Sequence, residues 1–149
     1  MLSRLETTPP RRIATAAQRR TPGVYLIDDQ RLLRAGLLDV MRVLGRFEVV
    51  GESGDLERAM REIPALRPSV VVLDLYQDLV TPSEAVRILQ RTAPCVPIVV
   101  LIDGRQACTT HSALSNGARA CLSKESEAIE LVLAIDAVHR GFTFVSPEL

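Results

Sequence analysis

Five short apolar segments recur along the chain, and each is separated from the next by a stretch with apolar residues at helical spacing. The segments are five or six residues long and lie at residues 23–27, 47–51, 69–73, 97–102 and 118–122. A run of this length with little polar character is typical of a strand that is buried on both faces. Strands that alternate with helices predict a parallel sheet with right-handed crossovers, because a parallel pair needs a long connection.

The stretches between the strands carry the signals of helix starts and stops. Helices are predicted at about residues 30–44, 55–66, 81–91, 106–116 and 126–140. The third has the clearest start, because Thr81 is a good N-cap, Pro82 fits the first helical position and Glu84 can complete a capping box. The sequence therefore predicts an α/β fold: a flavodoxin-like, doubly wound, five-stranded parallel sheet in the order 2-1-3-4-5, with helices on both faces.

Length and composition fit one domain of this kind. The 149 residues include no Trp, two Tyr and three Phe, so the core must be aliphatic. We expect a disordered basic leader at residues 1–22, a globular domain at residues 23–141, and the start of a linker or a C-terminal tail at residues 142–149. Within the leader, five arginines stand against Glu6 as the one acid.

Several classes of protein are disfavoured. The formal net charge is zero, which gives no overall attraction to nucleic acid or to an anionic membrane. No apolar run approaches the length of a membrane span, and the N-terminus lacks the apolar core of a secretory signal. Cys95, Cys108 and Cys121 are widely spaced, which argues against a disulfide framework or a zinc site; we expect each to be buried or half-buried.

Acidic residues follow two of the predicted strands, and a lysine follows a third. Asp28 and Asp29 end the first strand, Asp74 ends the third, and Lys124 comes just after the fifth. In an open parallel sheet, ligands bind outside the carboxyl ends of the strands, and the first strand lies beside the third in the expected order. We therefore expect these four side chains to converge, although acids after strands often only cap helices or line solvated loops.

Three carboxylates at close quarters repel each other unless a cation compensates them. Oxygen ligands in an open site suit Mg²⁺, which takes one or two carboxylates and keeps several waters. A carboxylate can also act as a nucleophile and form an aspartyl-phosphate, and an ammonium group can neutralise charge on the transferred phosphoryl group. The mixture of residue types therefore indicates phosphoryl chemistry with Mg²⁺ as the cofactor.

Between Gly23 and Leu149 the chain carries, in this order, the stretches VYLIDDQRLLRAGL, FEVVGES, RPSVVVLDL, GARACLSK and AIDAVHRGFTFVSPEL. In these stretches, their order and their spacing, it resembles a response-regulator receiver domain of two-component signalling. The last stretch is similar to the branch whose receiver precedes a LuxR-type helix-turn-helix and regulates transcription. No helix-turn-helix pattern occurs within these residues, so no DNA-binding region is expected in this chain.

The resemblance implies a role for each residue of the constellation. Asp74 would accept a phosphoryl group from a sensor histidine kinase, and Lys124 would contact the phosphoryl oxygens. Asp28, Asp29 and Asp74 would hold Mg²⁺, together with the backbone carbonyl of Tyr76. The chain would be a cytoplasmic phosphoacceptor and not an enzyme, with autodephosphorylation at most. A homodimer is possible under this resemblance, and no membrane partner is implied.

Two positions depart from the family pattern. Ile102 stands at the end of the fourth strand, where the family usually has Thr or Ser, so the hydroxyl that bonds the phosphoryl group is missing. Cys121 stands in the fifth strand, where the family often has an aromatic residue that moves with that hydroxyl. After Asp74 the loop adds Asp78, a further acid that could strengthen metal binding or hinder the phosphoryl group. The switch is therefore expected to be atypical.

Two other functions remain in competition. A pseudo-receiver would act as a protein-interaction or dimerisation module without phosphate, as the residues at Ile102 and Cys121 suggest. A small enzyme on the same fold is the third alternative. A haloacid-dehalogenase-type phosphatase would want an acid at Tyr76, two residues after the nucleophile, and a flavin site would want a phosphate-binding loop where Asp28, Asp29 and Gln30 stand.

Overall fold

The computed structural model describes residues 21–44, 46–75, 80–104 and 107–149 of the chain. Within these residues the strands form a single sheet. Their bounds are β1 (Gly23–Asp28), β2 (Glu48–Ser53), β3 (Val70–Asp74), β4 (Ile98–Ile102), β5 (Ala120–Ser123) and β6 (Phe144–Val145). The first five lie where the apolar segments predict them.

The predicted helices are also present. They are α1 (Arg31–Leu44), α2 (Leu56–Leu66), α3 (Pro82–Thr92), α4 (Ala107–Ser115) and α5 (Ala128–His139). The start of α3 confirms the predicted capping box, since the Glu84 amide donates to Thr81 Oγ1 at 3.2 Å and the Thr81 amide donates to Glu84 Oε2 at 2.9 Å. At the start of α2, the Arg58 amide donates to the Asp55 side chain at 2.7 Å, so an N-cap fixes this helix too.

The order of the strands in the described sheet is β2-β1-β3-β4-β5-β6, and all neighbouring pairs are parallel. The predicted order 2-1-3-4-5 is confirmed, with β6 as an addition at the edge. Phe144 pairs with Ala120, and Val145 pairs with Cys121. Two residues of the segment expected to begin a linker or tail therefore belong to the sheet.

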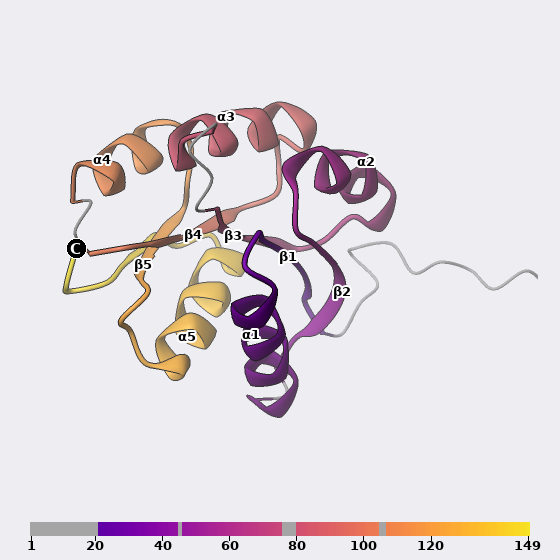
Figure 1. The fold of residues 1–149 in the computed structure, drawn as a ribbon, viewed down its shortest axis with the longest axis horizontal. Helices are drawn as coiled ribbons and strands as arrows, with labels where there is room; N and C mark the ends of the chain where they lie inside the picture. Colours follow the sequence, from indigo (N-terminus) through magenta and orange to yellow (C-terminus); the bar gives the residue numbers. More distant parts are fainter. Residues whose placement is uncertain (1–20, 45, 76–79, 105–106) are drawn as a thin grey trace, which may run out of the picture.

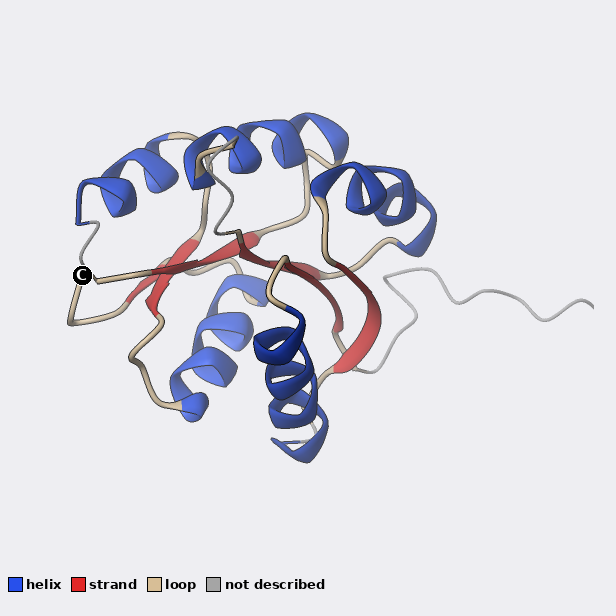
Figure 2. Ribbon diagram, viewed as in Figure 1, coloured by secondary structure: helices blue, strands red, loops and turns tan. Residues whose placement is uncertain are grey.

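The helices cover the sheet in two layers. Figure 1 and Figure 2 show α1 and α5 on one face and α2, α3 and α4 on the other. Because side chains alternate along a strand, neighbouring residues serve different cores. Leu26, Val72 and Leu101 pack in the core under α1 and α5, while Ile27, Val71 and Ile102 pack in the core under α2, α3 and α4. This two-sided burial explains why the strands read as continuous apolar runs.

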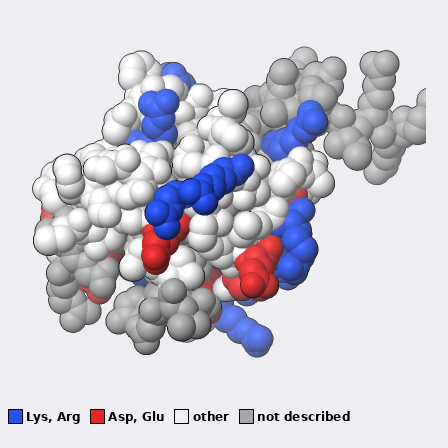
Figure 3. All heavy atoms as spheres, turned by 90° about the horizontal axis from the view of Figure 1, so that it is seen from above, with Lys and Arg blue, Asp and Glu red and all other residues white. Residues whose placement is uncertain are grey.

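The surface agrees in part with the sequence expectations. In the described residues no helix is long and apolar enough to cross a membrane. Figure 3 shows basic and acidic side chains together on the face of α2, α3 and α4. Cys121 is buried as expected. The prediction was wrong for Cys95 and Cys108, which are exposed, in a turn and on the surface of α4 respectively. The apolar pattern of the sequence alone does not reveal these positions. The expected leader lies almost wholly outside the described residues.

Candidate functional site

Asp28 and Asp74 lie side by side at the carboxyl end of the sheet. They form the last register pair between β1 and β3, and they are 0% and 1% exposed. The apolar residues before them bury both strands, so each strand carries its terminal carboxylate to the rim of the core. The predicted convergence of these two acids is therefore present in the structure.

Lys124 reaches this pair from the end of β5. Its Nζ lies 2.5 Å from Asp74 Oδ1, and the Lys124 side chain is 23% exposed. The backbone positions it, because the Lys124 amide donates to the Ile102 carbonyl at 2.9 Å at the end of β4. Lys124 is the single lysine of the chain, and it lies beside the acid that the sequence singles out.

Burial disfavours the ionised form of both carboxyl groups. Burial is the main cause that raises the pKa of Asp28 to about 6, and nearby Asp74 and Asp29 add to it, while the Gln30 amide, which donates to Asp28 Oδ1 at 2.8 Å, opposes it. Burial also raises the pKa of Asp74, opposed by its hydrogen bond and charge interaction with Lys124 and reinforced by the charge of Asp29. Asp29 is thus close enough to act electrostatically on both acids.

Two oxygens of this cluster have unmet bonding capacity. Asp28 Oδ2 and Asp74 Oδ2 are buried, and neither accepts a hydrogen bond from the part of the chain that the structure describes. Buried carboxylate oxygens without donors fit a hard cation. Among the described residues, no group of three Asp, Glu, His or Cys side chains is placed to hold a metal ion by itself. Mg²⁺ generally takes one or two carboxylates and fills its remaining positions with water and other oxygens.

Ile102 and Cys121 lie on the face of the sheet under α4. Both are buried, at 2% and 0% exposure. The Cys121 thiol points to the Thr110 carbonyl of α4, with 3.9 Å between Sγ and O, and burial raises the pKa of this thiol to about 11. Both side chains are therefore packed as apolar core groups, and Ile102 presents no hydroxyl at the end of β4.

Two residues named in the sequence analysis cannot be placed. Tyr76 and Asp78 lie outside the described residues. Conversely, the structure adds two residues that the sequence did not single out. Arg34 of α1 donates to the Asp28 carbonyl, and Ser146 after β6 accepts a hydrogen bond from the Ser123 amide at 3.0 Å. Neither follows from a motif, since both contacts depend on how the chain returns to the sheet.

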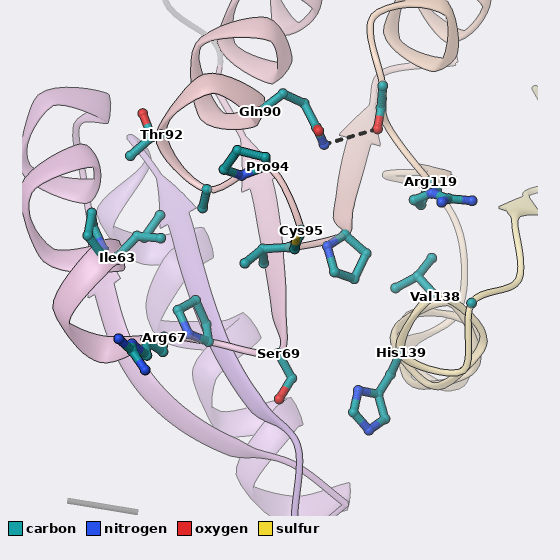
Figure 4. Close-up of a pocket in the computed structure, with 17 residues that line it drawn as sticks. Ile63, Arg67, Ser69, Gln90, Thr92, Pro94, Cys95, Arg119, Val138 and His139 are labelled. Carbon is teal, nitrogen blue, oxygen red and sulfur yellow. Dashed lines mark hydrogen bonds between the residues drawn. The ribbon is translucent and has the colours of Figure 1, made fainter. Parts of the chain in front are cut away.

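One surface hollow lies at the opposite end of the sheet from the acid cluster. It measures about 980 Å³ and is lined in part by Arg67, Cys95, Arg119 and His139 (Figure 4). None of the acid cluster lines it. A smaller hollow of about 170 Å³ is lined by Asp74, Lys124 and mainly aliphatic residues of α1, β4, β5 and α5. The candidate site is therefore an open rim with a small apolar recess, rather than a deep pocket.

Comparison with known proteins identifies the family. The family model described as the response regulator receiver domain matches residues 24–136. The chain belongs to the response-regulator receiver family. A transcriptional regulatory protein, DegU from Brevibacillus brevis, is 32% identical over 127 residues, which cover 85% of this chain and 53% of DegU. The DNA-binding transcriptional activator DevR/DosR of Mycobacterium tuberculosis is 31% identical over 118 residues, which cover 79% of this chain and 54% of DevR/DosR. This receiver spans about half the length of these relatives.

Solved structures agree with this assignment. A LuxR-family two-component response regulator from Aurantimonas superposes with a TM-score of 0.76 and 27% identity, over 86% of this receiver and 91% of that chain. The receiver domain of the response regulator NarL from Mycobacterium tuberculosis has a TM-score of 0.73 and 25% identity, over 83% of this chain and 99% of that one. Receiver domains of this family generally accept phosphate on an aspartate, from sensor histidine kinases, and typically bind Mg²⁺ at that site.

Proposed function

We propose that this receiver accepts a phosphoryl group on Asp74 from a sensor histidine kinase in the cytoplasm. The observation that carries the proposal is the ion pair between Lys124 Nζ and Asp74 Oδ1 at 2.5 Å, beside a second buried acid, Asp28. Asp74 is the one acid of the cluster that lies between another carboxylate and a lysine. A carboxylate oxygen would attack the phosphorus, the bond from phosphorus to the kinase histidine would break, and the imidazole would leave with the electron pair.

Each neighbour of Asp74 has a separate part in this proposal. Asp28 and Asp29, with Asp74 and the backbone carbonyl of Tyr76, would hold Mg²⁺, which neutralises charge on the phosphoryl oxygens when it is bound. Lys124 already points at Asp74 and would bond a phosphoryl oxygen once one is present. The chain itself would act as a phosphoacceptor, with at most autodephosphorylation.

Incubation with Mg²⁺ and acetyl phosphate, followed by intact-mass measurement, tests the proposal. The wild type should gain the mass of one phosphoryl group, and Asp74→Asn should gain none. Asp39→Asn is a matched control, because Asp39 is exposed on α1 with 78% of its side chain accessible, and this variant should gain mass as the wild type does. An unmodified wild type, or equal modification of Asp74→Asn, contradicts the proposal.

A second function, that of a pseudo-receiver, is favoured by the packing of Ile102 and Cys121. Both are buried apolar groups at the positions where a hydroxyl and an aromatic ring usually transmit phosphorylation. A ligand shifts a conformational equilibrium only if it interacts differently with the two states, and here the usual contact is absent. In a pseudo-receiver, dimerisation measured by analytical ultracentrifugation would be the same in the wild type and Asp74→Asn, with and without acetyl phosphate. A phosphate-dependent change in the wild type alone rejects this alternative.

A further inference from the structure

The side chain of Arg34 links α1 to the ends of two strands. Arg34 Nη1 donates to the Asp28 carbonyl at 2.5 Å, and Arg34 Nε donates to Glu52 Oε2 on β2 at 3.1 Å. The Arg34 side chain is 20% exposed, whereas that of Glu52 is 47% exposed. One guanidinium group therefore contacts the turn that carries Asp28 and also the neighbouring strand.

The Asp28 carbonyl lies one residue beyond the end of the ladder between β1 and β2. The register between β1 and β2 ends at the pair Ile27–Ser53, one residue before Asp28. A backbone carbonyl at this depth needs a donor, because an unpaired polar group loses free energy when it leaves water. Arg34 supplies that donor, so the ladder between the strands is in effect extended by a side chain.

The sequence leaves room for this contact at Gly54. A Cβ atom built on Gly54 would lie 2.9 Å from Arg34 Nη1, which is closer than such atoms approach in proteins. Any other residue at position 54 would displace the guanidinium from its position. Gly54 therefore leaves space for the guanidinium group of Arg34, and Glu52 pairs with its Nε.

The carbonyl that Arg34 holds belongs to the peptide bond between Asp28 and Asp29. This bond is planar, so fixing its oxygen fixes the direction in which the chain enters Asp29. Two further bonds complete the turn: the Gln30 amide donates to Asp28 Oδ1 at 2.8 Å, and the Arg34 amide donates to the Gln30 carbonyl at 2.9 Å. Arg34 thus anchors the acid pair through both its backbone and its side chain.

We infer that Arg34 is a positioning residue that holds the Asp28–Asp29 turn in the geometry needed to bind a divalent cation beside Asp74. This inference rests on the proposed function, since it concerns the same site. Groups that orient metal ligands typically change metal affinity by about 10- to 100-fold when they are removed. Lysine would keep the charge, but its single ammonium group cannot reproduce two contacts of a planar fork.

The test compares Arg34→Ala, Arg34→Lys and Gly54→Ala with Arg58→Ala. Arg58 is a matched control, because its Nε pairs with Glu62 Oε1 at 2.6 Å within α2, away from the acid pair. Mg²⁺ affinity is measured by isothermal titration calorimetry on the unphosphorylated protein. Arg34→Ala should raise the Kd about tenfold, Arg34→Lys and Gly54→Ala should raise it less, and Arg58→Ala should leave it unchanged. If Arg34→Ala does not fold, the Mg²⁺ affinities of Arg34→Lys and Gly54→Ala, compared with that of Arg58→Ala, test the inference instead.

Hydrogen exchange of the Gln30 amide, followed by NMR without metal, provides the second readout. This amide should exchange faster in Arg34→Ala than in the wild type or Arg58→Ala, because the turn that protects it is loosened. If the wild type binds Mg²⁺ and Arg34→Ala binds it equally well, the inference is wrong and the proposed function stands. If the wild type binds no Mg²⁺ at millimolar concentration, the proposed function fails, and the inference fails with it. If Arg34→Ala binds Mg²⁺ more weakly but the Gln30 amide exchanges as in the wild type, Arg34 does not act by holding this turn, and the inference is wrong.

Discussion

Lys124 Nζ and Asp74 Oδ1 are 2.5 Å apart, although their strands, β5 and β3, are separated in the sheet by β4. The lysine side chain therefore passes over the end of β4, where Ile102 has no polar side chain to meet it. The Asp74 side chain is 2% exposed, so this contact is shielded from solvent on the acid's side. Shielded pairs of this kind respond strongly when one partner is removed, because the other charge stays buried.

Replacing Lys124 with Met should raise the pKa of Asp74 further, since Lys124 is what opposes the effect of burial. The raised pKa means that the folded state holds the Asp74 proton more tightly than the unfolded chain does. The loss of stability should therefore be small in acid and grow to about 1–3 kcal/mol at neutral pH. Urea unfolding at pH 4 and pH 7.5 measures this difference. Equal losses at both pH values would show that the lysine stabilises the fold only through packing.

Asp28→Asn should stabilise the protein at neutral pH. The pKa of Asp28 rises from 3.8 to about 6, chiefly by burial, so ionising it costs about 3 kcal/mol more in the folded state than in the unfolded chain. With a raised folded pKa, wild-type stability should fall as the pH rises from about 4 to about 6. The variant retains an acceptor for the Gln30 amide and should lose most of this slope. Thermal unfolding across that range, without Mg²⁺, would contradict the assignment if both proteins showed the same slope.

Ile102→Thr should restore a donor at the end of β4. Ile102 is 2% exposed, so the buried hydroxyl should destabilise the unphosphorylated protein by about 1–3 kcal/mol. If Asp74 is the phosphoacceptor, the hydroxyl should increase the affinity for beryllofluoride, a phosphoryl mimic, about tenfold, because hydrogen bonds to charged groups contribute about 1.5–3 kcal/mol. Ile102→Val is the control, since it has nearly the same shape without the hydroxyl. A gain in Ile102→Val equal to that in Ile102→Thr would rule out the hydrogen bond.

Ser146→Ala should destabilise the protein by about 1–3 kcal/mol, because it leaves the buried Ser123 amide without its acceptor. Ser126→Ala is the comparison, because the Ser126 hydroxyl bonds the same Ser146 oxygen at 3.1 Å but is only part-buried. Urea unfolding should show a clearly smaller effect for Ser126→Ala. If the two variants lose the same stability, the bond to the Ser123 amide is not the main contribution of Ser146.

Gly51→Ala and Gly36→Ala should have opposite effects. A Cβ at Gly51 would lie 2.6 Å from the buried ring of Tyr25, whose hydroxyl donates to Glu62 at 2.6 Å, so the ring has little freedom to move away. We expect a loss of about 1–3 kcal/mol from overpacking. Gly36 lies in α1 with nothing within 4 Å of an added Cβ, so alanine there should stabilise the helix by up to about 1 kcal/mol. Melting temperatures that shift in the same direction would contradict this reading.

The sequence predicted the five strands, the five helices and the convergence of Asp28, Asp74 and Lys124 because each depends on local pattern and on the topology of parallel sheets. Buried strands followed by charged residues leave little choice about which edge carries the charges. The sequence did not predict the side-chain contacts between different helices and strands. The bond from Arg34 to the Asp28 carbonyl depends on where α1 returns along β1, and that from Ser146 to Ser123 depends on a strand of only two residues.

The prediction that Cys95 and Cys108 are buried failed for a related reason. A small apolar residue carries little information about burial unless the helix or strand around it has a strong period. Cys121 lies within a strand and was placed correctly, whereas Cys95 lies in the turn before β4 and Cys108 at the start of α4.

The direction of β6 has a consequence for how this domain connects to anything that follows it. A chain that ended directly after α5 would stop at the amino-terminal ends of the strands, away from Asp74. Because β6 runs parallel to β5, the chain instead returns toward the carboxyl ends of the strands, where Asp74 and Lys124 lie. There the amide of Ser146 donates to the Cys121 carbonyl at 3.0 Å. In a longer protein, a segment that follows this domain would thus begin on the side of the sheet that carries Asp74 and Lys124.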